Sequence, residues 1–304
     1  MAESYGWAGK ILRVNLTTGE ITTQDDEKYH KYIGGMGMAY RIMYEEAPME
    51  LDPYDEKALV IFGVGPLTGA GVPCSGRMNV TFRSTWSKGH SIIDAHMGGH
   101  IGSMLKYAGY DGIVVSGISE KPVYLRIEDG EVSLEDASEI WGKGTFASNK
   151  WMVEQNGREF ETASIGPAGE KKVLLAAIMN DKDRAAGRSG VGAVMGSKKL
   201  KAIVVKATRK KLDNIADLDA LKVAAKNAMD VLKANPVTGS GLRQLGTAVL
   251  VNIVNNIGAF PTKNWQESYY DKGDDISGET LAEKYLVKPG ACHLCPIACG
   301  RVVN

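Results

Sequence analysis

The sequence lacks an excess of charge of either sign. Its 304 residues include 36 Lys plus Arg and 36 Asp plus Glu, so the formal net charge is zero at neutral pH. A protein that binds nucleic acid through a broad basic surface would carry an excess of Lys and Arg. We therefore expect no nucleic-acid partner, and any bound anion must be held by a local arrangement of groups.

Long apolar runs are also lacking. No stretch approaches the roughly 18 consecutive apolar residues of a membrane-spanning helix. The N-terminal residues do not have the basic-then-apolar layout of a secretory signal. We expect no membrane span and a cytoplasmic location. A hydrophobic content of 44% is ordinary for a globular protein, and the length suffices for one large domain or two smaller ones.

Cysteine is scarce, and its distribution is uneven. Only four cysteines occur, and three of them lie within eight residues, at Cys292, Cys295 and Cys299. A disulfide-stabilised secreted protein would spread its cysteines through the chain. The clustering therefore indicates a metal site.

The spacing of this motif, Cys-x2-Cys-Pro-x2-Cys, favours an iron–sulfur cluster, because a tight loop with two intervening residues can curl around a cubane. Pro296 can begin a helix, which would place Cys299 on its first turn. Zinc is the main alternative, although structural zinc needs four ligands. Buried or unligated cysteines are a third possibility.

The fourth ligand of such a cluster has two possible sources. Cys74 could supply it, but a cysteine beyond Asn304 is the more natural source. We therefore expect the cluster site to be incomplete within this chain.

Glycine, by contrast, is abundant, at 36 of 304 residues, and it gathers in loops. In the stretch 180–200, Arg184 and Arg188 bracket small residues, so backbone N–H groups and two guanidinium groups can converge on a phosphate. We predict an anion site here; the alternative is an ordinary solvated loop. Gly190, Gly192 and Gly196 only loosely match a dinucleotide fingerprint, since the short helix expected at 193–200 cannot form a Rossmann crossover.

Two further small-residue tracts support a site built from several loops. Residues 65–76 lead into Arg77 and a strand, and residues 95–100 open a helix. His96 and His100 are four apart, but the glycines between them disfavour a metal pair on a settled helix. Together the tracts suit a large, flat, phosphorylated ligand.

The predicted elements indicate an α+β fold. A hairpin-rich region with brief helices at 36–46, 99–107 and 145–155 gives way near residue 210 to helices at 218–234, 247–257 and 278–286. We expect a mixed β domain over 1–210 and the start of a helical domain over 211–304. The expected strands are 10–16, 21–24, 58–65, 77–84, 112–117, 123–127, 131–134, 160–165, 172–179 and 201–207.

These stretches together resemble the aldehyde ferredoxin oxidoreductase family of tungsten enzymes. The matching segments are Gly-Pro-Leu-Thr-Gly at 65–69, Ala-Ser-Ile-Gly-Pro-Ala-Gly-Glu at 163–170, Ala-Ile-Met-Asn-Asp at 177–181, Arg-Ala-Ala-Gly-Arg at 184–188, Gly-Val-Gly-Ala-Val-Met-Gly-Ser-Lys at 190–198, Gly-Thr-Ala-Val-Leu-Val-Asn-Ile at 246–253 and the cysteine motif. The resemblance implies a two-sheet β base that seats two pterins, followed by helical domains.

The resemblance also implies cofactors and site residues. These are a tungsten held by two pterins, a 4Fe-4S cluster with Cys292, Cys295 and Cys299 as ligands, and a Mg²⁺ ion between the pterin phosphates. Magnesium would be bound by the backbone carbonyls of two residues, and the pterins would be contacted by a further set. The implied residues are His96 and Ala185 for magnesium, and Arg77, Gly98, Arg184, Gly187 and Arg188 for the pterins.

At two positions the sequence departs from the archetypal members, which carry Asn and Ser where His96 and Met97 stand here. A backbone carbonyl survives that exchange. The departure hints at a branch nearer the tungsten subunits of benzoyl-CoA reductases.

The activity implied is oxidation of an aldehyde to a carboxylic acid, with electrons passed to ferredoxin or to an iron–sulfur partner subunit, in an oligomer. Catalytic acid–base residues are expected beyond residue 304, and the chain alone is expected to be inactive. Two alternatives are a benzoyl-CoA reductase-type tungsten subunit and a non-catalytic iron–sulfur or zinc module.

Overall fold

The computed structural model describes residues 4–181 and 183–304 and confirms the α+β class. The chain divides into two compact units, one ending at Leu218 and the other spanning Asp219–Asn304. None of the helices in the described part is both long and apolar enough to cross a membrane.

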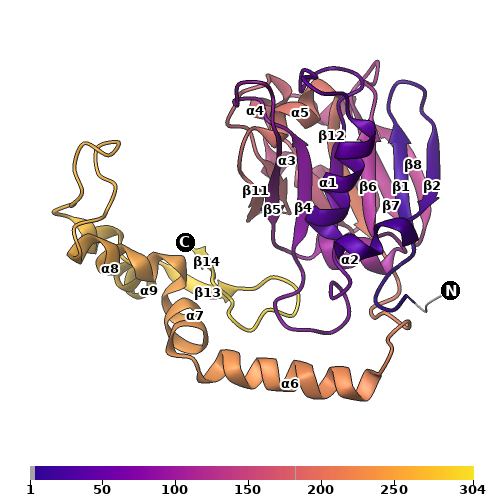
Figure 1. Ribbon diagram of the computed structural model, residues 1–304. Coiled ribbons are helices and arrows are strands. Elements are labelled where there is room, and N and C mark those ends of the chain that lie inside the picture. Colours follow the sequence, from indigo (N-terminus) through magenta and orange to yellow (C-terminus); the bar gives the residue numbers. More distant parts are fainter. Residues whose placement is uncertain (1–3, 182) are drawn as a thin grey trace. The chain divides into compact units, whose positions relative to one another are not determined.

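Unit 1 is built on two six-stranded sheets (Figure 1). Sheet 1 has the order β2-β1-β6-β3-β4-β5, and sheet 2 has the order β8-β7-β12-β9-β10-β11. All neighbouring pairs are antiparallel except β1–β6 and β7–β12. The strands are β1 (Lys10–Asn15), β2 (Ile21–Asp25), β3 (Val60–Gly63), β4 (Met78–Arg83), β5 (Ile92–Met97), β6 (Gly112–Ser116), β7 (Val123–Glu128), β8 (Glu131–Asp136), β9 (Glu161–Ser164), β10 (Ile178–Asn180), β11 (Arg184–Ala186) and β12 (Leu200–Lys206).

The two sheets repeat one topology. In each, a hairpin comes first, a long helix follows, three antiparallel strands lead to the edge, and a short helix returns the chain to a strand parallel to the first. The long helices are α1 (Gly35–Glu46) and α3 (Thr145–Asn156). The short return helices are α2 (Ile101–Tyr107) and α5 (Val191–Ser197), and α4 (Pro167–Glu170) is a single turn.

The alternation of apolar side chains along the strands explains the layers. Leu12, Phe62 and Ile113 belong to the large core between the sheets, whereas Ile11 and Val114, one residue away, pack under α1. On the far side of sheet 2, a third apolar cluster lies beneath α3. Both sheets are therefore buried on both faces, as Figure 1 shows for α1 across sheet 1.

Unit 2 is mainly helical. Its elements are α6 (Leu218–Ala234), α7 (Leu242–Leu245), α8 (Leu250–Asn256), α9 (Gly278–Lys284) and a hairpin of β13 (Leu286–Gly290) with β14 (Gly300–Val303). Helix α6 ends where the sequence predicts, because Pro236 follows and the Asn235 side chain accepts hydrogen bonds from Val237 N and Thr238 N at 2.9 and 3.2 Å.

Two predictions of elements were wrong, and four strands were missed. The strand expected at 172–179 is only Ile178–Asn180, because the preceding residues form turns: Val173 N donates to Ala168 O at 2.8 Å, and Ala176 N donates to Val173 O at 2.9 Å. The strand β5 was missed, since residues 95–100 were taken to open a helix. That helix begins only at Ile101, because Gly99 has a φ of 94°, which no α-helix allows. The short strands β11, β13 and β14 were missed too.

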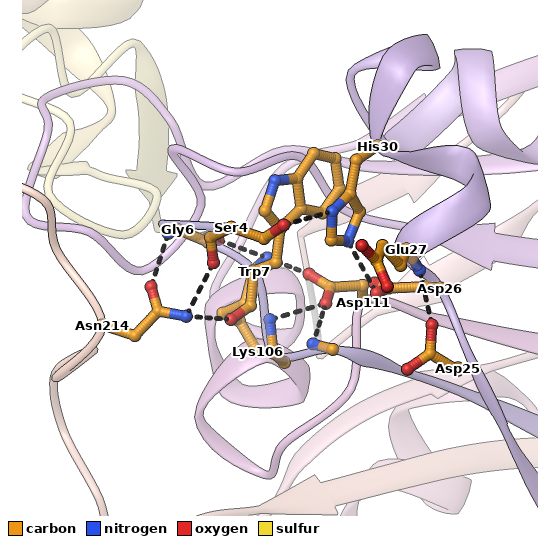
Figure 2. Close-up of polar contacts among 12 residues, drawn as sticks. Ser4, Gly6, Trp7, Asp25, Asp26, Glu27, His30, Lys106, Asp111 and Asn214 are labelled. Atoms are coloured by element: carbon orange, nitrogen blue, oxygen red, sulfur yellow. Dashed lines mark hydrogen bonds and ion pairs between the residues drawn. The ribbon is translucent and has the colours of Figure 1, made fainter. Parts of the chain in front are cut away.

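A buried ionic cluster lies at the N-terminal side of unit 1 (Figure 2). Lys106 and Asp111 form an ion pair, and both are fully buried. The Asp26 carboxyl is also buried, and its Oδ1 lies 2.7 Å from Nε2 of His30. Burial raises the pKa of Asp26 to about 8, and the neighbouring Asp111 adds to the rise. Burial also lowers the pKa of His30.

This cluster fixes the N-terminal segment against the segment that leaves β12. Lys106 Nζ donates to the Gly6 carbonyl at 3.0 Å, and the Trp7 ring stacks on His30 with ring centroids 4.1 Å apart. Asn214 holds the same segment, because its Oδ1 accepts from Gly6 N at 2.7 Å and its Nδ2 donates to Ser4 O and Trp7 O (Figure 2).

Candidate functional site

Most of the predicted anion-binding residues of unit 1, but not Arg188, gather where the edges of the two sheets meet. β5 is the last strand of sheet 1, β11 is the last strand of sheet 2, and the two strands lie next to each other. His96 and Gly98, at the end of β5, are thereby brought near Arg184 and Ala185 of β11. The sequence gives no direct sign of this meeting, because about 90 residues separate the two strands.

A glycine and an asparagine lie close together at this junction. A Cβ on Gly99 would lie 1.6 Å from Asn180 Oδ1 and 3.6 Å from Arg184 Cγ. Asn180 is the cross-strand partner of Arg184, and its Nδ2 donates to Thr162 O at 2.8 Å. Its Oδ1 is buried and has no hydrogen-bond partner within the described residues. Only glycine permits this approach of the two edges.

Arg77 lies at the same end of β5. Because Met78 pairs with Met97, Arg77 stands at the level of Gly98 just before β4 begins. Helix α2 packs closely behind it, since a Cβ on Gly102 would be 3.0 Å from the Gly76 carbonyl oxygen. The Arg77 side chain is left exposed, whereas that of Arg184 is only 17% exposed.

Arg188 lies at the opposite end of β4. Thr85, just beyond that strand, donates to the carbonyl of Ser189 at 3.2 Å, and a Cβ on Gly190 would be 2.2 Å from Thr85 Oγ1. Arg77 and Arg188 are therefore separated by the length of β4, which is about 20 Å for six residues. A small anion cannot contact both, but a large ligand with more than one phosphate can.

In both sheets the short return helix packs closely on the chain near this junction. Gly192 of α5 donates to Ala176 O at 3.0 Å, and a Cβ there would lie 2.5 Å from Ala177 O, just before β10. Gly102 of α2 makes the corresponding approach just before β4. Each return helix therefore packs on the chain that enters the second-last strand of its own sheet.

The imidazole of His96 is engaged within its own sheet. Its Nε2 lies 2.7 Å from Asp94 Oδ2, and Tyr40 donates from its hydroxyl to Asp94 Oδ1 at 3.0 Å. Burial, and then the bond to Asp94, raises the pKa of Tyr40 to about 12. The imidazole thus has a protein partner, and the His96 backbone carbonyl is the group left for a role at the junction.

In unit 2 the three clustered cysteines share one loop. β13 and β14 pair up to Gly290 and Gly300, so residues 291–299 form the connection of a hairpin. Cys295 N donates to Cys292 O at 3.1 Å, which closes a tight turn. The residues before the second and third cysteines, Leu294 and Ala298, have left-handed φ values of 48° and 47°.

The prediction that Pro296 begins a helix was wrong. The loop runs from a turn directly into β14, and the left-handed φ of Ala298 is incompatible with a helix through Cys299. Cys299 is instead presented immediately before the strand.

The thiols fit an iron–sulfur group better than zinc. Within residues 4–181 and 183–304, no three His, Cys, Asp or Glu side chains are gathered as ligands of one metal ion. Zinc needs its four ligands around a single point. A cubane instead binds each thiolate to a separate iron, so its ligands need not converge on one atom. Three partly exposed cysteines on one nine-residue loop match that requirement.

Sequence reasoning missed one residue of the junction. Asn180 carries no charge and sits beside a conspicuous acidic and basic run, so its role follows only from its contact with Gly99.

Comparison with known proteins places the chain in a family. The model for the N-terminal domain of aldehyde ferredoxin oxidoreductase matches residues 11–207, and the model for domains 2 and 3 of that enzyme matches residues 223–304. The chain is 46% identical over 301 residues to the tungsten-containing aldehyde ferredoxin oxidoreductase of Pyrococcus furiosus, and 44% identical to that of Thermococcus kodakarensis. Each match covers 98% of this chain and 49% of the relative.

A solved structure is similar over the same extent. The active-site complex BamBC of benzoyl-coenzyme A reductase, with 1,5-dienoyl-CoA, matches with a TM-score of 0.84 and 28% identity, covering 99% of this chain and 47% of that one. The chain thus spans about half the length of the relatives it matches. On the evidence of its two domain matches and its identity to these enzymes, the chain belongs to the aldehyde ferredoxin oxidoreductase family.

Proposed function

We propose that this chain is the cofactor-seating part of a tungsten oxidoreductase that converts aldehydes to carboxylic acids. The observation that carries the proposal is the meeting of β5 and β11, which gathers residues from both sheets at one junction. The names of the relatives, tungsten-containing aldehyde ferredoxin oxidoreductases, support the same conclusion. When bound, a tungsten–bispterin group supplies the two-electron chemistry of such an oxidation.

The residues of the junction hold this cofactor through its phosphates and its flat rings. Arg184, whose stem packs against Gly99, has a restricted side chain and can form a bidentate pair with a phosphate. Arg77 and Arg188 engage more distant groups, at the two ends of β4. Gly98 and Gly187 let the backbone approach the ligand, since neither carries a side chain.

Magnesium belongs to the same proposal. The backbone carbonyls of His96 and Ala185 lie on the two edge strands that meet, so one ion can be shared between the sheets. Carbonyl oxygens are suitable ligands for Mg²⁺, which is otherwise coordinated by phosphates and water. The occupied imidazole of His96 does not compete with this role.

Cys292, Cys295 and Cys299 hold a 4Fe-4S group in unit 2. Its role is to pass electrons singly to ferredoxin or to an iron–sulfur partner subunit, within an oligomer.

Elemental analysis tests the proposal. The double substitution Arg184→Ala with Arg188→Ala should abolish retention of tungsten and of cofactor phosphate through purification, while iron is retained. Arg158→Ala, on the exposed turn after α3, removes a guanidinium away from the junction and should leave tungsten unchanged. Full tungsten in the double variant, or zinc in place of iron and tungsten in the unaltered protein, would refute the assignment.

A second candidate is the tungsten subunit of a reductase that acts on an aromatic thioester. The fold similarity to the BamBC complex favours it, as do His96 and Met97 in place of Asn and Ser. Aldehyde oxidation with a viologen dye, compared with reduction of benzoyl-CoA by a strong reductant, separates the two candidates.

A further inference from the structure

One arginine side chain ties the cysteine loop of unit 2 to a neighbouring helix. Arg301 lies in β14, two residues after Cys299. Its guanidinium donates four hydrogen bonds, all to backbone carbonyls. These are Nε to Gly300 O at 2.7 Å, Nη1 to Gln244 O at 2.8 Å, and Nη2 to both Arg243 O, at 3.0 Å, and Ala298 O.

The four accepting carbonyls belong to two segments, the helix α7 and the residues that flank Cys299. Arg243 and Gln244 lie in the single-turn helix α7, whose last carbonyls have no partner inside the helix. Ala298 and Gly300 are the residues on either side of Cys299. One side chain therefore fixes both flanks of a cluster ligand to the end of α7.

Neighbouring residues pack closely against the Arg301 side chain and the cysteine loop. Gly246, with a φ of 68°, follows α7, and a Cβ there would lie 3.0 Å from both Cys299 O and Arg301 Nε. Arg243 reaches back to the loop, since its Nη1 donates to Pro296 O at 2.6 Å. Two guanidinium groups thus lie against the segment that carries the second and third cysteines.

The positive charge of Arg301 is not neutralised locally. Its hydrogen bonds go to carbonyls, and no ion pair to a carboxylate is formed by Arg301 or Arg243 among the residues that the structure describes. An arginine keeps its proton throughout the ordinary pH range. Reduction of an iron–sulfur group adds one negative charge to it, and a fixed cation beside a ligand stabilises that charge.

We propose that Arg301 is a positioning residue for the iron–sulfur group, which orders the Cys299 end of the loop and raises the reduction potential of the group. The inference rests on the proposed function, because it assumes that the three cysteines hold such a group. Hydrogen bonding and charge around a ligated metal commonly control both its retention and its potential.

The test compares Arg301→Gln, Arg301→Lys and Lys288→Gln in the purified protein with its iron bound. Lys288→Gln is the matched control: it removes one positive charge from an exposed position of the same hairpin, paired with Val302, without touching the loop carbonyls. The measurements are the midpoint potential from a redox titration followed by electron paramagnetic resonance, and the rate of iron loss to a chelator.

We expect Arg301→Gln to shift the potential to more negative values and to release iron roughly 10-fold faster. Arg301→Lys, which keeps the charge but not the fork of donors, should release iron faster and retain a potential closer to that of the unaltered protein. Lys288→Gln should change neither. If Arg301→Gln is recovered without iron, the reduction potential and the rate of iron release of Arg301→Lys test the inference in its place.

An unchanged potential in Arg301→Gln, an unchanged rate of iron release in Arg301→Lys, or a shift of the potential of the same size in Lys288→Gln would overturn the inference. Those results leave the proposed function standing, since they require a bound cluster. Absence of iron and labile sulfide from the unaltered protein is a different result, and it would contradict the proposed function itself.

Discussion

Asn180 Oδ1 occupies the place where a side chain on Gly99 would be. Asn180 is the cross-strand partner of Arg184 in β11, and Gly99 follows β5, so the two residues constrain each other where the sheet edges meet. A side chain at position 99 must push the asparagine, and with it the Arg184 strand, away from β5.

Gly99→Ala should lower the free energy of unfolding of unit 1 by about 3 kcal/mol, because it combines a left-handed φ of 94° with a steric clash. Gly157→Ala is the matched control: Gly157 has a φ of 101° but open space around its Cα, so only about 1 kcal/mol should be lost. Urea unfolding measures both. Equal losses would mean that the contact with Asn180 imposes no constraint.

Asp26→Asn should make the stability of unit 1 less dependent on pH. The pKa of Asp26 is about 8 in the folded protein, above its ordinary value near 4. The folded state therefore holds this proton more tightly than the unfolded state. The stabilisation is complete below pH 4 and is lost as the pH rises to 8, at no more than about 1.4 kcal/mol per pH unit.

Thermal unfolding between pH 4 and pH 9 measures this dependence. The asparagine keeps a hydrogen-bond acceptor for His30 and cannot ionise, so the variant should be the more stable protein at pH 8 (Figure 2). Asp25→Asn, at the exposed neighbouring position, should follow the unaltered protein. Parallel curves for Asp26→Asn and the unaltered protein would show that Asp26 ionises normally.

Lys106→Met should destabilise unit 1 by about 3–5 kcal/mol, because it leaves the fully buried Asp111 carboxylate without its cation. The backbone donors Ala8 N and Gly9 N remain, at 2.6 and 2.9 Å from Asp111 Oδ2, and should limit the loss. Lys121→Met breaks an exposed pair with Asp136 and should produce no measurable change in urea unfolding. Similar small effects of both substitutions would contradict a structural role for the buried pair.

Cys295→Ser should remove bound iron, whereas Cys74→Ser should not. The backbone N–H of Cys295 closes the turn of the loop on Cys292 O, so Cys295 is the middle cysteine of the motif and lies within the turn. Cys74 is exposed in the small-residue tract that precedes β4. Iron and labile sulfide per chain measure the effect. Loss of iron in Cys74→Ser would identify that residue as the fourth ligand.

The sequence predicted the hairpins and the long helices well because each has a local cause. Residues 10–16 and 21–24 alternate around a turn, and they form β1 and β2 as expected. Helix α6 has apolar residues at helical spacing and ends at an Asn-Pro pair, and its bounds match the prediction.

The strands at the candidate site could not be predicted in the same way. β5 contains Asp94 and His96 among apolar residues and runs into two glycines, so local propensity favours neither strand nor helix. It is a strand because all six of its residues pair with β4. β11, with only three residues, likewise depends on its neighbour β10. The candidate site residues were predicted from resemblance and from charge, and the meeting of β5 with β11 depends on long-range pairing.

The repeated strand order points to a gene duplication. Ile101-Gly102 and Ile113-Val114-Val115 recur as Val191-Gly192 and Ile203-Val204-Val205 at a constant offset of 90 residues. Such a pattern is what a duplicated and fused ancestral gene leaves behind. The junction of β5 with β11 then lies at the seam between the two copies, so neither copy alone possessed it. Binding at that seam would have become possible only when two copies came together, and each copy could afterwards diverge to suit its own half of the ligand.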